Sequence, residues 1–480
     1  MARKSIKKNY IFNLSYQILL LLTPLITTPY LSRVLGADGI GTVSFSESVV
    51  SYFTLFATLG ITLYGQREIA YTQADRAKRT AVFWETKLLE VITGLIVLSV
   101  YIPFALFQQD RILYLILSFN LLAVVVDVIW LFQGMEEFGK IVFRNILFKI
   151  ISIIYIFTAV KTRDDIHKYV FGVAFFLFLG NFSLWAYVPR YVDKPDWGSL
   201  RPARNLKTVL SLFIPTIAIQ IYTVLDKTMI GVITRDAFEN GYYEQALKIS
   251  KMVLTVVTSL GTVMAPRIGY HFGTGDYEEV QTCMYRGYRF VWFMGIPLSF
   301  GLLGVSSNFV PWFFGDGFGK VVPLISILGF LILAIGVNNL TGIQYLIPTK
   351  RQNLFTLTVL IGAAINFGLN AVLIYKFQSI GAAVASVTAE TTIALVQLYL
   401  VRKELSVRRI FSLSMHYVIA GFVMLVFLKV TGSVFSPSIL HTGIMVIGGA
   451  AVYFITLLAF RDSFFINNLA GVFRKIVKRK

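Results

Sequence analysis

Fourteen stretches of mostly apolar residues, each about twenty residues long, follow one another along this chain and are joined by short connections. At 1.5 Å of rise per helical residue, each stretch can cross the ~30 Å hydrocarbon core of a bilayer. Inside lipid every backbone polar group must be satisfied within the protein, so stretches of this kind fold as helices. The predicted spans are residues 9–32, 40–63, 81–107, 112–132, 141–160, 169–188, 209–233, 244–265, 288–309, 321–343, 354–375, 379–401, 415–431 and 439–460. The sequence therefore predicts an all-α, polytopic membrane protein.

The distribution of positive charge predicts how the chain is oriented. A net charge of +19 would suggest a nucleic-acid partner in a soluble protein, but most of the 44 Lys and Arg fall in the two termini and in the even-numbered connections. This bias is typical of the cytoplasmic side of a membrane protein. We therefore expect a cytoplasmic (inner or plasma) membrane location with both termini in the cytoplasm. We also expect basic segments that meet anionic lipid headgroups, and no nucleic-acid partner.

The chain also shows a weak internal repeat at an offset of about 200 residues. Gly41 matches Gly241, Arg67 matches Arg267, and both halves carry three polar residues at i, i+4 and i+7, which share one helical face. Those residues are Ser44, Ser48 and Ser51 in one half and Glu244, Lys248 and Lys251 in the other. Because each repeat holds an even number of spans, both copies insert in the same orientation and are related by a pseudo-two-fold axis. We predict two pseudo-symmetric six-helix lobes, residues 1–206 and 207–403, and a C-terminal helix pair with a basic tail, residues 404–480. Chance matching of apolar letters is the alternative.

Several charged residues lie inside predicted spans, where a charge costs ~2.5–3.5 kcal/mol at the bilayer centre. Lys248 and Lys251 lie one turn apart, Lys227 lies in the seventh span, and Arg33 ends the first span. The functional interpretation is a central cavity, lined by the first, second, seventh and eighth spans, that directs cations at an anionic substrate. The structural interpretation is that each cation forms an ion pair or extends its stem to an interface.

Acidic residues are the second polar signal within the spans. Glu47 adjoins the serine face of the second span, and Asp127, Asp226 and Glu390 lie in the fourth, seventh and twelfth spans. Ion pairing within the protein would also explain each of them. The third span begins with Glu85, Lys87 and Glu90, for which we expect a structural role near the cytoplasmic interface.

Several kinds of catalytic or cofactor site have no counterpart in the sequence. There is no GxxxxGK[ST] loop and hence no encoded ATPase motor. The four histidines are scattered along the chain, which predicts no metal site. The connections are too short to hold a soluble catalytic domain. We expect no cofactor and no enzymatic activity.

Five segments together resemble a known family. They are PYLSRVLGADGIG (29–41), YGQREIA (64–70), WLFQGMEEFGKIVFRNILFKI (130–150), LDKTMIG (225–231) and NFGLNAVLIYKFQSIGAA (366–383). These segments resemble the polysaccharide transporter (Wzx-type) flippases of the multidrug, oligosaccharidyl-lipid and polysaccharide exporter superfamily. The resemblance covers nearly the whole chain and is weakest in the last two spans.

The resemblance implies a flippase that moves a polyprenyl-pyrophosphate-linked oligosaccharide repeat unit to the outer leaflet for capsule or O-antigen synthesis, by alternating access of its two lobes. A polysaccharide polymerase and chain-length machinery are expected partners. By this resemblance Arg33 and Lys227 fall within two of the quoted segments, and Lys248 falls within the family's eighth-span segment. With Lys251, these residues would hold the pyrophosphate. The remaining site candidates are Tyr52 and Tyr222 for sugar contacts, and Glu47, Asp127, Asp226 and Glu390 for coupling to a proton or sodium gradient.

Two other functions remain open from the sequence. One is a multidrug or other small-molecule exporter of the same superfamily, although an excess of cations over acids in the cavity disfavours cationic drugs. The other is a membrane glycan polymerase or ligase, an enzyme that usually carries a long outer loop, and this chain has no such loop.

Overall fold

The computed structural model of the 480-residue chain describes residues 6–259 and 261–467, and within these ranges it is built of helices without strands. Side chains are described except at residues 6–18, 20–21, 214–216, 218–219, 221–222 and 262–263. The chain forms two compact units that divide between Thr228 and Met229. This division falls inside helix α8, whereas the repeat predicts a lobe boundary at 206/207; the predicted lobe boundaries stay predictions.

Every predicted span has a helical counterpart in the described residues. Ten helical stretches there are long and apolar enough to cross a membrane. Two of the ten are 50 residues long and contain a non-helical residue, Gly36 in one and Gln378 in the other, so each supplies two of the predicted spans. The prediction of an all-α polytopic membrane protein is confirmed.

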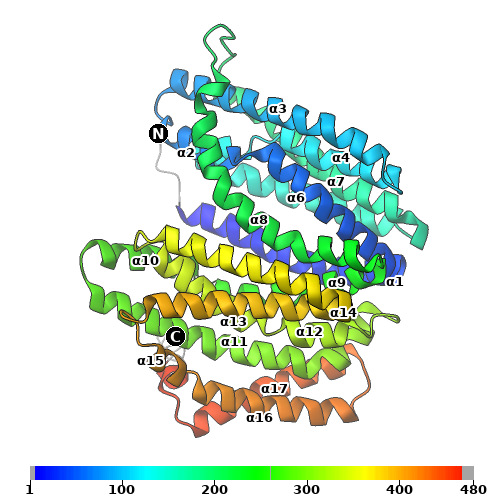
Figure 1. The fold of residues 1–480 in the computed structure, drawn as a ribbon, viewed down its shortest axis with the longest axis vertical. Coiled ribbons are helices and arrows are strands. Elements are labelled where there is room, and N and C mark those ends of the chain that lie inside the picture. The colour runs from blue at the N-terminus through cyan, green and yellow to red at the C-terminus, as the bar shows by residue number, and fades with distance from the viewer. Residues whose placement is uncertain (1–5, 260, 468–480) are drawn as a thin grey trace, which may run out of the picture. The chain divides into compact units, whose positions relative to one another are not determined.

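The N-terminal unit is a helical bundle in which α1 packs against α3, α4 and α6, and α4 packs against α7 (Figure 1). Its α-helices are α1 (Ile6–Thr58), α2 (Ile61–Tyr71), α3 (Arg76–Leu106), α4 (Arg111–Val125), α5 (Ile129–Gly134), α6 (Phe138–Ala159), α7 (Ile166–Ser183) and the part of α8 (Leu206–Thr234) that ends at Thr228. Short 3₁₀ segments occupy Arg163–Asp165, Leu184–Arg190 and Pro202–Asn205. Gly36 breaks α1 with φ 71° and ψ 175°, a conformation that glycine adopts without a Cβ clash.

In the C-terminal unit, α11 packs against α16 and α17, and α9 packs against α12 and α13 (Figure 1). The helices are α9 (Ala237–Thr258), α10 (Gly261–Gly273), α11 (Tyr277–Phe314), α12 (Val321–Leu328), α13 (Leu331–Asn338), a π-helix (Asn339–Leu346), α14 (Gln352–Val401), α15 (Val407–Ser412), α16 (Met415–Val434) and α17 (Ile439–Ala459). The predicted C-terminal helix pair is thus α16 and α17, which pack on each other as well.

The order of elements repeats between the two units at the offset seen in the sequence. The second part of α1 ends at Thr58 and α9 ends at Thr258, and the short helices α2 and α10 begin at Ile61 and Gly261. The predicted spans 40–63 and 244–265 therefore run too far, because each joins a membrane helix to the short helix that follows it. Composition alone could not reveal the turn at Gly60, which has φ 76°.

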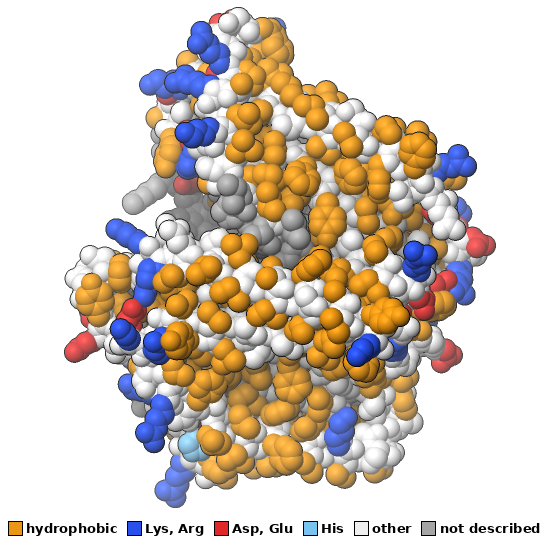
Figure 2. Space-filling view, in the orientation of Figure 1, with side chains coloured by type: hydrophobic (Ala, Val, Ile, Leu, Met, Phe, Trp, Pro, Cys, Tyr) orange, Lys and Arg blue, Asp and Glu red, His pale blue; other side chains and the backbone are white. Residues whose placement is uncertain are grey.

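Hydrophobic side chains cover the middle of the visible face of each unit, and charged side chains lie mostly toward the helix ends (Figure 2). Ile96 and Val100 on α3, Val430 on α16 and Ile447 on α17 are each at least 59% exposed, because they lie on faces that meet no other helix of their unit. An exposed apolar belt of this kind suits a bilayer as solvent.

Candidate functional site

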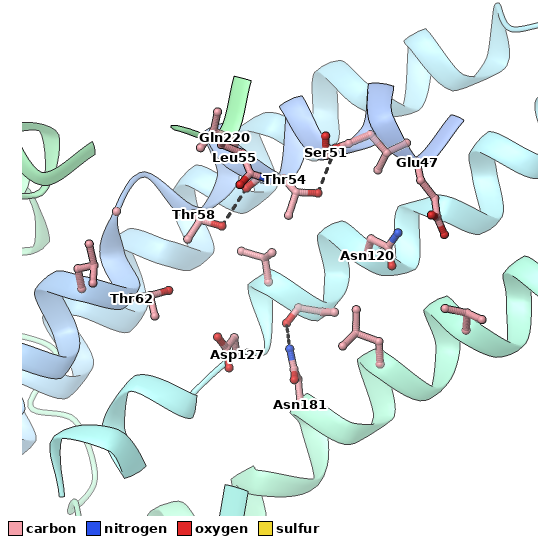
Figure 3. A pocket seen from close by; sticks show the side chains of 17 residues that line it. Glu47, Ser51, Thr54, Leu55, Thr58, Thr62, Asn120, Asp127, Asn181 and Gln220 are labelled. Atoms are coloured by element: carbon pink, nitrogen blue, oxygen red, sulfur yellow. Dashed lines mark hydrogen bonds between the residues drawn. The ribbon is translucent and has the colours of Figure 1, made fainter. Parts of the chain in front are cut away.

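The N-terminal unit contains a cavity of about 580 Å³ within its bundle, lined by both apolar and polar side chains (Figure 3). It is lined by the second part of α1, the start of α2, α4 and the residues just after it, α7, and α8. Its polar side chains are Glu47, Ser51, Thr54, Thr58, Thr62, Asn120, Asp127, Asn181 and Gln220. Two of the four predicted coupling acids, Glu47 and Asp127, therefore line one cavity.

Asp127 reaches the cavity because α4 stops at Val125. After this break the Asp127 carboxylate accepts a hydrogen bond at 2.9 Å from the backbone N–H of Ile129, at the start of α5. The carboxylate thus satisfies a donor at the beginning of a helix, where the helix dipole favours negative charge. Figure 3 shows Asp127 next to Asn181 at one end of the cavity.

Asn181 is fixed from two sides. It donates to the backbone oxygen of Ala123 at 2.8 Å, and its side-chain oxygen accepts from the buried guanidinium of Arg144 at 2.6 Å. Arg144, on α6, is only 7% exposed. No sequence pattern indicates that Arg144 and Asn181 pair, because 37 residues separate them.

Lys87 and Glu90 form a buried ion pair on α3, 2% and 1% exposed, with their atoms 2.8 Å apart. Lys87 also donates to the backbone oxygen of Asp127 at 2.6 Å, and Glu90 accepts from the indole of Trp130 at 3.4 Å. The sequence placed both charges near a membrane interface, but the structure buries them against α5. In the sequence, the i, i+3 spacing of Lys87 and Glu90 is the feature that indicates that the two side chains can pair.

The serine face of α1 contacts α8 in the same unit. Thr228 donates to the hydroxyl of Ser48 at 3.0 Å, and the hydroxyls of Tyr52 and Thr228 lie 3.1 Å apart. Tyr52, a predicted sugar contact, thus forms a hydrogen bond with Thr228, the residue that follows Lys227 in the sequence. The side chain of Tyr222, the other predicted sugar contact, lies outside the described side chains.

The predicted cations are distributed between the two units. Arg33 is exposed on α1 and donates to the backbone oxygen of Pro29 at 2.9 Å, and Lys227 is half-buried on α8 next to Asp226. Both belong to the N-terminal unit, whereas Lys248 and Lys251 belong to the C-terminal unit. Their convergence on one cavity therefore stays a prediction.

Within α9, Lys248 lies 3.8 Å from the carboxylate of Glu244, one turn earlier, and its side chain is 31% exposed. Lys251, one turn later, is exposed. Lys248 is therefore not an isolated charge. An ion pair of this kind is what the structural interpretation of the lysine requires. A contact of 3.8 Å at partial exposure is a weak one, so it leaves the ammonium available to a stronger anion.

Glu390, the last predicted coupling acid, lies in a polar region of the C-terminal unit. Its carboxylate accepts from the amide of Asn338 at 2.8 Å, directly before the π-helix, a type of helix frequent at functional sites. Nearby in sequence, Asn370 donates to Asn366 at 3.1 Å, and both are buried. The sequence alone does not indicate that Asn338 contacts Glu390, because 52 residues separate them.

A second buried acid in this unit was missed. Glu239 is 4% exposed and accepts from Lys320 at 2.6 Å, and from the hydroxyl and backbone N–H of Ser379 at 2.6 and 3.1 Å. Ser379 follows Gln378, whose φ of 55° breaks α14. Glu239 therefore caps the second part of α14, and a structural role accounts for its contacts.

No group of three or more His, Cys, Asp or Glu side chains suited to a metal ion occurs in the part of the chain that the structure describes. The chemistry that this arrangement supports is binding: hydroxyl, amide and carboxylate groups around a cavity in one unit, and cations along α9 in the other.

Comparison with known proteins identifies the family. A family model described as "Polysaccharide biosynthesis protein" matches residues 6–271, more than half of the chain. The chain belongs to this family.

Relatives in the family extend over nearly the whole chain. A protein of Escherichia coli (strain K12) named "Putative O-antigen transporter" is 25% identical over 413 residues, which cover 83% of this chain and 97% of the relative. A protein of the same assigned name from Shigella dysenteriae is 21% identical over 391 residues, covering 79% and 96%.

Solved structures share the fold. The lipid II flippase MurJ in an inward closed conformation matches with a TM-score of 0.70 at 18% identity, over 95% of this chain and 99% of that one. An inward-facing multidrug resistance transporter of the MATE family and MOP superfamily matches with a TM-score of 0.62 at 13% identity, over 82% and 98%. The predicted membership of a polysaccharide family is confirmed by the family model, and the solved structures show that the fold is shared with a flippase and a multidrug transporter. The chain is a multi-pass membrane protein of this family, and the relatives and solved structures above are named as transporters or as a flippase and not as polymerases or ligases.

Proposed function

We propose that this transporter is a flippase that moves a polyprenyl-pyrophosphate-linked oligosaccharide repeat unit across the cytoplasmic membrane by alternating access. The observation that carries the proposal is the likeness to proteins named O-antigen transporters over 96–97% of their length. The product would serve capsule or O-antigen type polysaccharide synthesis, with a polymerase and chain-length machinery as partners. The charge bias of the connections supports insertion with both termini in the cytoplasm.

The physical task of such a flippase is to keep sugars and charge out of hydrocarbon. Each hydroxyl that enters lipid without a hydrogen-bond partner costs about 4–8 kcal/mol on hydrocarbon scales, and a charged phosphate costs far more. The polyprenyl tail can stay in the bilayer while the headgroup passes between the lobes. Lys227, Lys248, Lys251 and Arg33 would hold the pyrophosphate, and Tyr52 and Tyr222 would contact sugars.

The acids supply the proposed coupling. Glu47 and Asp127 line the cavity of the N-terminal unit with amide and hydroxyl groups, a set of ligands that suits either a proton or sodium. Asp226 and Glu390 are the further candidates. Binding of a cation in this cavity would favour one arrangement of the bundle, and the gradient would then set the direction of transport.

The test is transport of a defined lipid-linked oligosaccharide into proteoliposomes, with proton and sodium gradients imposed separately. We expect Lys248→Ala to lower the transport rate at least about tenfold, the size of losing one charge-assisted contact, and Lys248→Arg to retain most of it. The matched control is Lys429→Ala, which removes an exposed lysine of α16. Equal rates for Lys248→Ala and Lys429→Ala would remove Lys248 from the mechanism.

Coupling is tested in the same vesicles. Asp127→Asn should abolish the response of the rate to the driving gradient while binding of the lipid-linked oligosaccharide persists. Glu85→Gln is the control, since Glu85 contacts Arg201 and Asn205 instead of the cavity. Unchanged gradient response in Asp127→Asn would exclude that carboxylate. Efflux of a cationic dye without oligosaccharide transport would favour the drug-exporter alternative over the proposed function.

A further inference from the structure

The C-terminal unit holds a second charged pocket that the transport proposal does not use. It has a volume of about 390 Å³ and lies where α11, α15 and the turn after α17 meet. We call it the arginine pocket, after Arg286, Arg289 and Arg409. Its other lining residues are Thr282, Tyr285, Leu413, Ser463, Phe464 and Asn467.

Arg289 forms the fixed part of this pocket. Its guanidinium donates to the hydroxyl of Tyr417 at 2.9 Å, to Asp462 at 2.8 Å and to Ser463 at 3.1 Å. Asp462 in turn accepts from Tyr417 at 3.2 Å and from the backbone N–H of Phe465 at 2.8 Å. These bonds join α11 to α16 and to the turn after α17, so the pocket is pre-formed.

Arg286 and Arg409 supply the available charge. Arg286 is 65% exposed, and its contact with Glu279 is long, at 4.0 Å. Glu279 pairs more closely with Arg267, at 2.9 Å. The guanidinium of Arg409 lies 4.2 Å from the ring centre of Tyr285. Among the residues that the structure describes, no carboxylate lies within 4.0 Å of this guanidinium. Asp462 offsets one of the three positive charges, which leaves the pocket with a positive excess.

The depth of the pocket matches that of lipid headgroups. Helix α11 has 38 residues, and ~20 residues suffice to cross the hydrocarbon core, so its first turns lie outside it. On α11, Arg286 lies before the predicted span 288–309 and Arg289 is the second residue of that span. Arg409 lies before α16 begins at Met415, and Ser463 follows the end of α17 at Ala459. All three elements thus enter the pocket at the end of a membrane helix.

An apolar groove adjoins the same elements. Trp292, one turn beyond Arg289 on α11, donates to the backbone oxygen of Ile410 at 3.1 Å, and its ring lies 6.0 Å from that of Phe411. Trp292 and Phe411 line a second cavity of about 300 Å³. Its remaining lining is almost wholly aliphatic and comes from α13 and α14. A ligand with a charged head and an acyl chain fits this combination better than a free anion.

We propose that the arginine pocket binds the phosphodiester headgroup of an anionic phospholipid such as phosphatidylglycerol. Guanidinium groups match phosphate oxygens in planar, charge-assisted hydrogen bonds, and basic pockets between membrane helices on the cytoplasmic side select anionic lipids. The pocket depends on α15 and on the turns next to α16 and α17, the helices without a counterpart in the N-terminal half. The bound lipid therefore fastens the appended helix pair to α11, apart from the route of the transported headgroup.

The test uses the purified full-length protein in detergent and measures lipid adducts by native mass spectrometry. The probes are phosphatidylglycerol and phosphatidylcholine with identical acyl chains, inorganic phosphate, and a polyprenyl-pyrophosphate-linked oligosaccharide. We expect the protein to retain phosphatidylglycerol in preference to phosphatidylcholine. The double variant R286Q/R409Q should weaken phosphatidylglycerol binding about 30-fold, since each arginine near a membrane surface contributes about a fivefold effect.

The control is R408Q, which removes the neighbouring exposed arginine of α15 that does not line the pocket. It should change binding less than about twofold. Should R286Q/R409Q fail to elute as a folded monodisperse protein, R286K/R409K keeps the charge while losing the planar fork, and should weaken binding about tenfold.

Three results would overturn the proposal. The first is equal loss of phosphatidylglycerol in R408Q and in the pocket variant. The second is full displacement of the lipid by millimolar inorganic phosphate, which would make the pocket an ion site. The third is stoichiometric displacement by the lipid-linked oligosaccharide, which would make it a substrate site. Retained phosphatidylglycerol binding in the transport-deficient Lys248→Ala would keep the two proposals separate.

Discussion

Replacing Lys87 by methionine should destabilise the protein more than any other single lysine change at a described position of α3. Lys87 is 2% exposed and donates to the Glu90 carboxylate at 2.8 Å and to the backbone oxygen of Asp127 at 2.6 Å. Methionine keeps the volume and apolar stem but leaves the 1% exposed carboxylate of Glu90 without its cation. Breaking one side of a buried ion pair costs about 3–5 kcal/mol, and an exposed pair contributes about 0–1 kcal/mol.

The measurement is the free energy of unfolding in mixed SDS and detergent micelles, followed by tryptophan fluorescence. Lys78→Met is the matched control, because Lys78 lies on the same helix, more than two turns before Lys87. Lys78 pairs with Asp75 at 3.5 Å, and the side chains of Lys78 and Asp75 are 76% and 45% exposed. We expect a loss of about 3–5 kcal/mol for Lys87→Met and below about 1 kcal/mol for Lys78→Met. The double variant Lys87→Met/Glu90→Leu should be less destabilised than Lys87→Met alone, since it removes the buried charge. Equal losses for Lys87→Met and Lys78→Met would refute the reasoning.

Two further predictions concern packing and pH. Gly65→Ala should cost about 1–3 kcal/mol of unfolding free energy, because its Cβ would lie 2.6 Å from the ring of the fully buried Trp130, whereas Gly368→Ala, with nothing within 4 Å, should be neutral or slightly stabilising. Burial raises the pKa of the Glu404 carboxyl, but the hydrogen bonds that it accepts from Arg351, at 2.7 and 2.9 Å, lower the pKa by more. The pKa of Glu404 is therefore below its usual value. Because the folded pKa is depressed, this stabilisation is present above the unfolded pKa and is lost as pH falls through the folded value. The difference in melting temperature between Glu404→Gln and the unchanged protein should therefore shrink on acidification below about pH 4, and a constant difference would contradict the assignment.

The spans were predictable because hydropathy is a property of each segment by itself. A run of apolar residues must become a helix in lipid whatever surrounds it, so every predicted span has its helix. The ends were less predictable. Gly60, with φ 76°, separates α1 from the short helix α2, and nothing in the apolar count distinguishes a residue in that turn from one in a helix.

The site was only half predictable, for a physical reason. A sequence shows which charges lie inside spans, and the structure puts two of them, Glu47 and Asp127, on one cavity, while their role in coupling stays a prediction. It does not show which charges meet. The contact of Lys87 with the Asp127 backbone joins residues 40 positions apart, and that of Asn338 with Glu390 joins residues 52 apart. Such pairs depend on how helices pack, which one sequence does not specify locally.

The two units share an order of elements but differ in the chemistry that they place in it. In the N-terminal unit the second part of α1 presents serines and Glu47, and Glu47 and Asp127 face a cavity. At the same offset in the C-terminal unit, α9 presents Lys248 and Lys251. Retaining a charge within a span costs ~2.5–3.5 kcal/mol, so a repeat that diverged without functional constraint should have lost the charges in both copies. Glu47 and Asp127 therefore suit the proposed binding of a coupling cation, and Lys248 and Lys251 suit the proposed binding of the substrate's phosphates, together with Arg33 and Lys227 of the N-terminal unit.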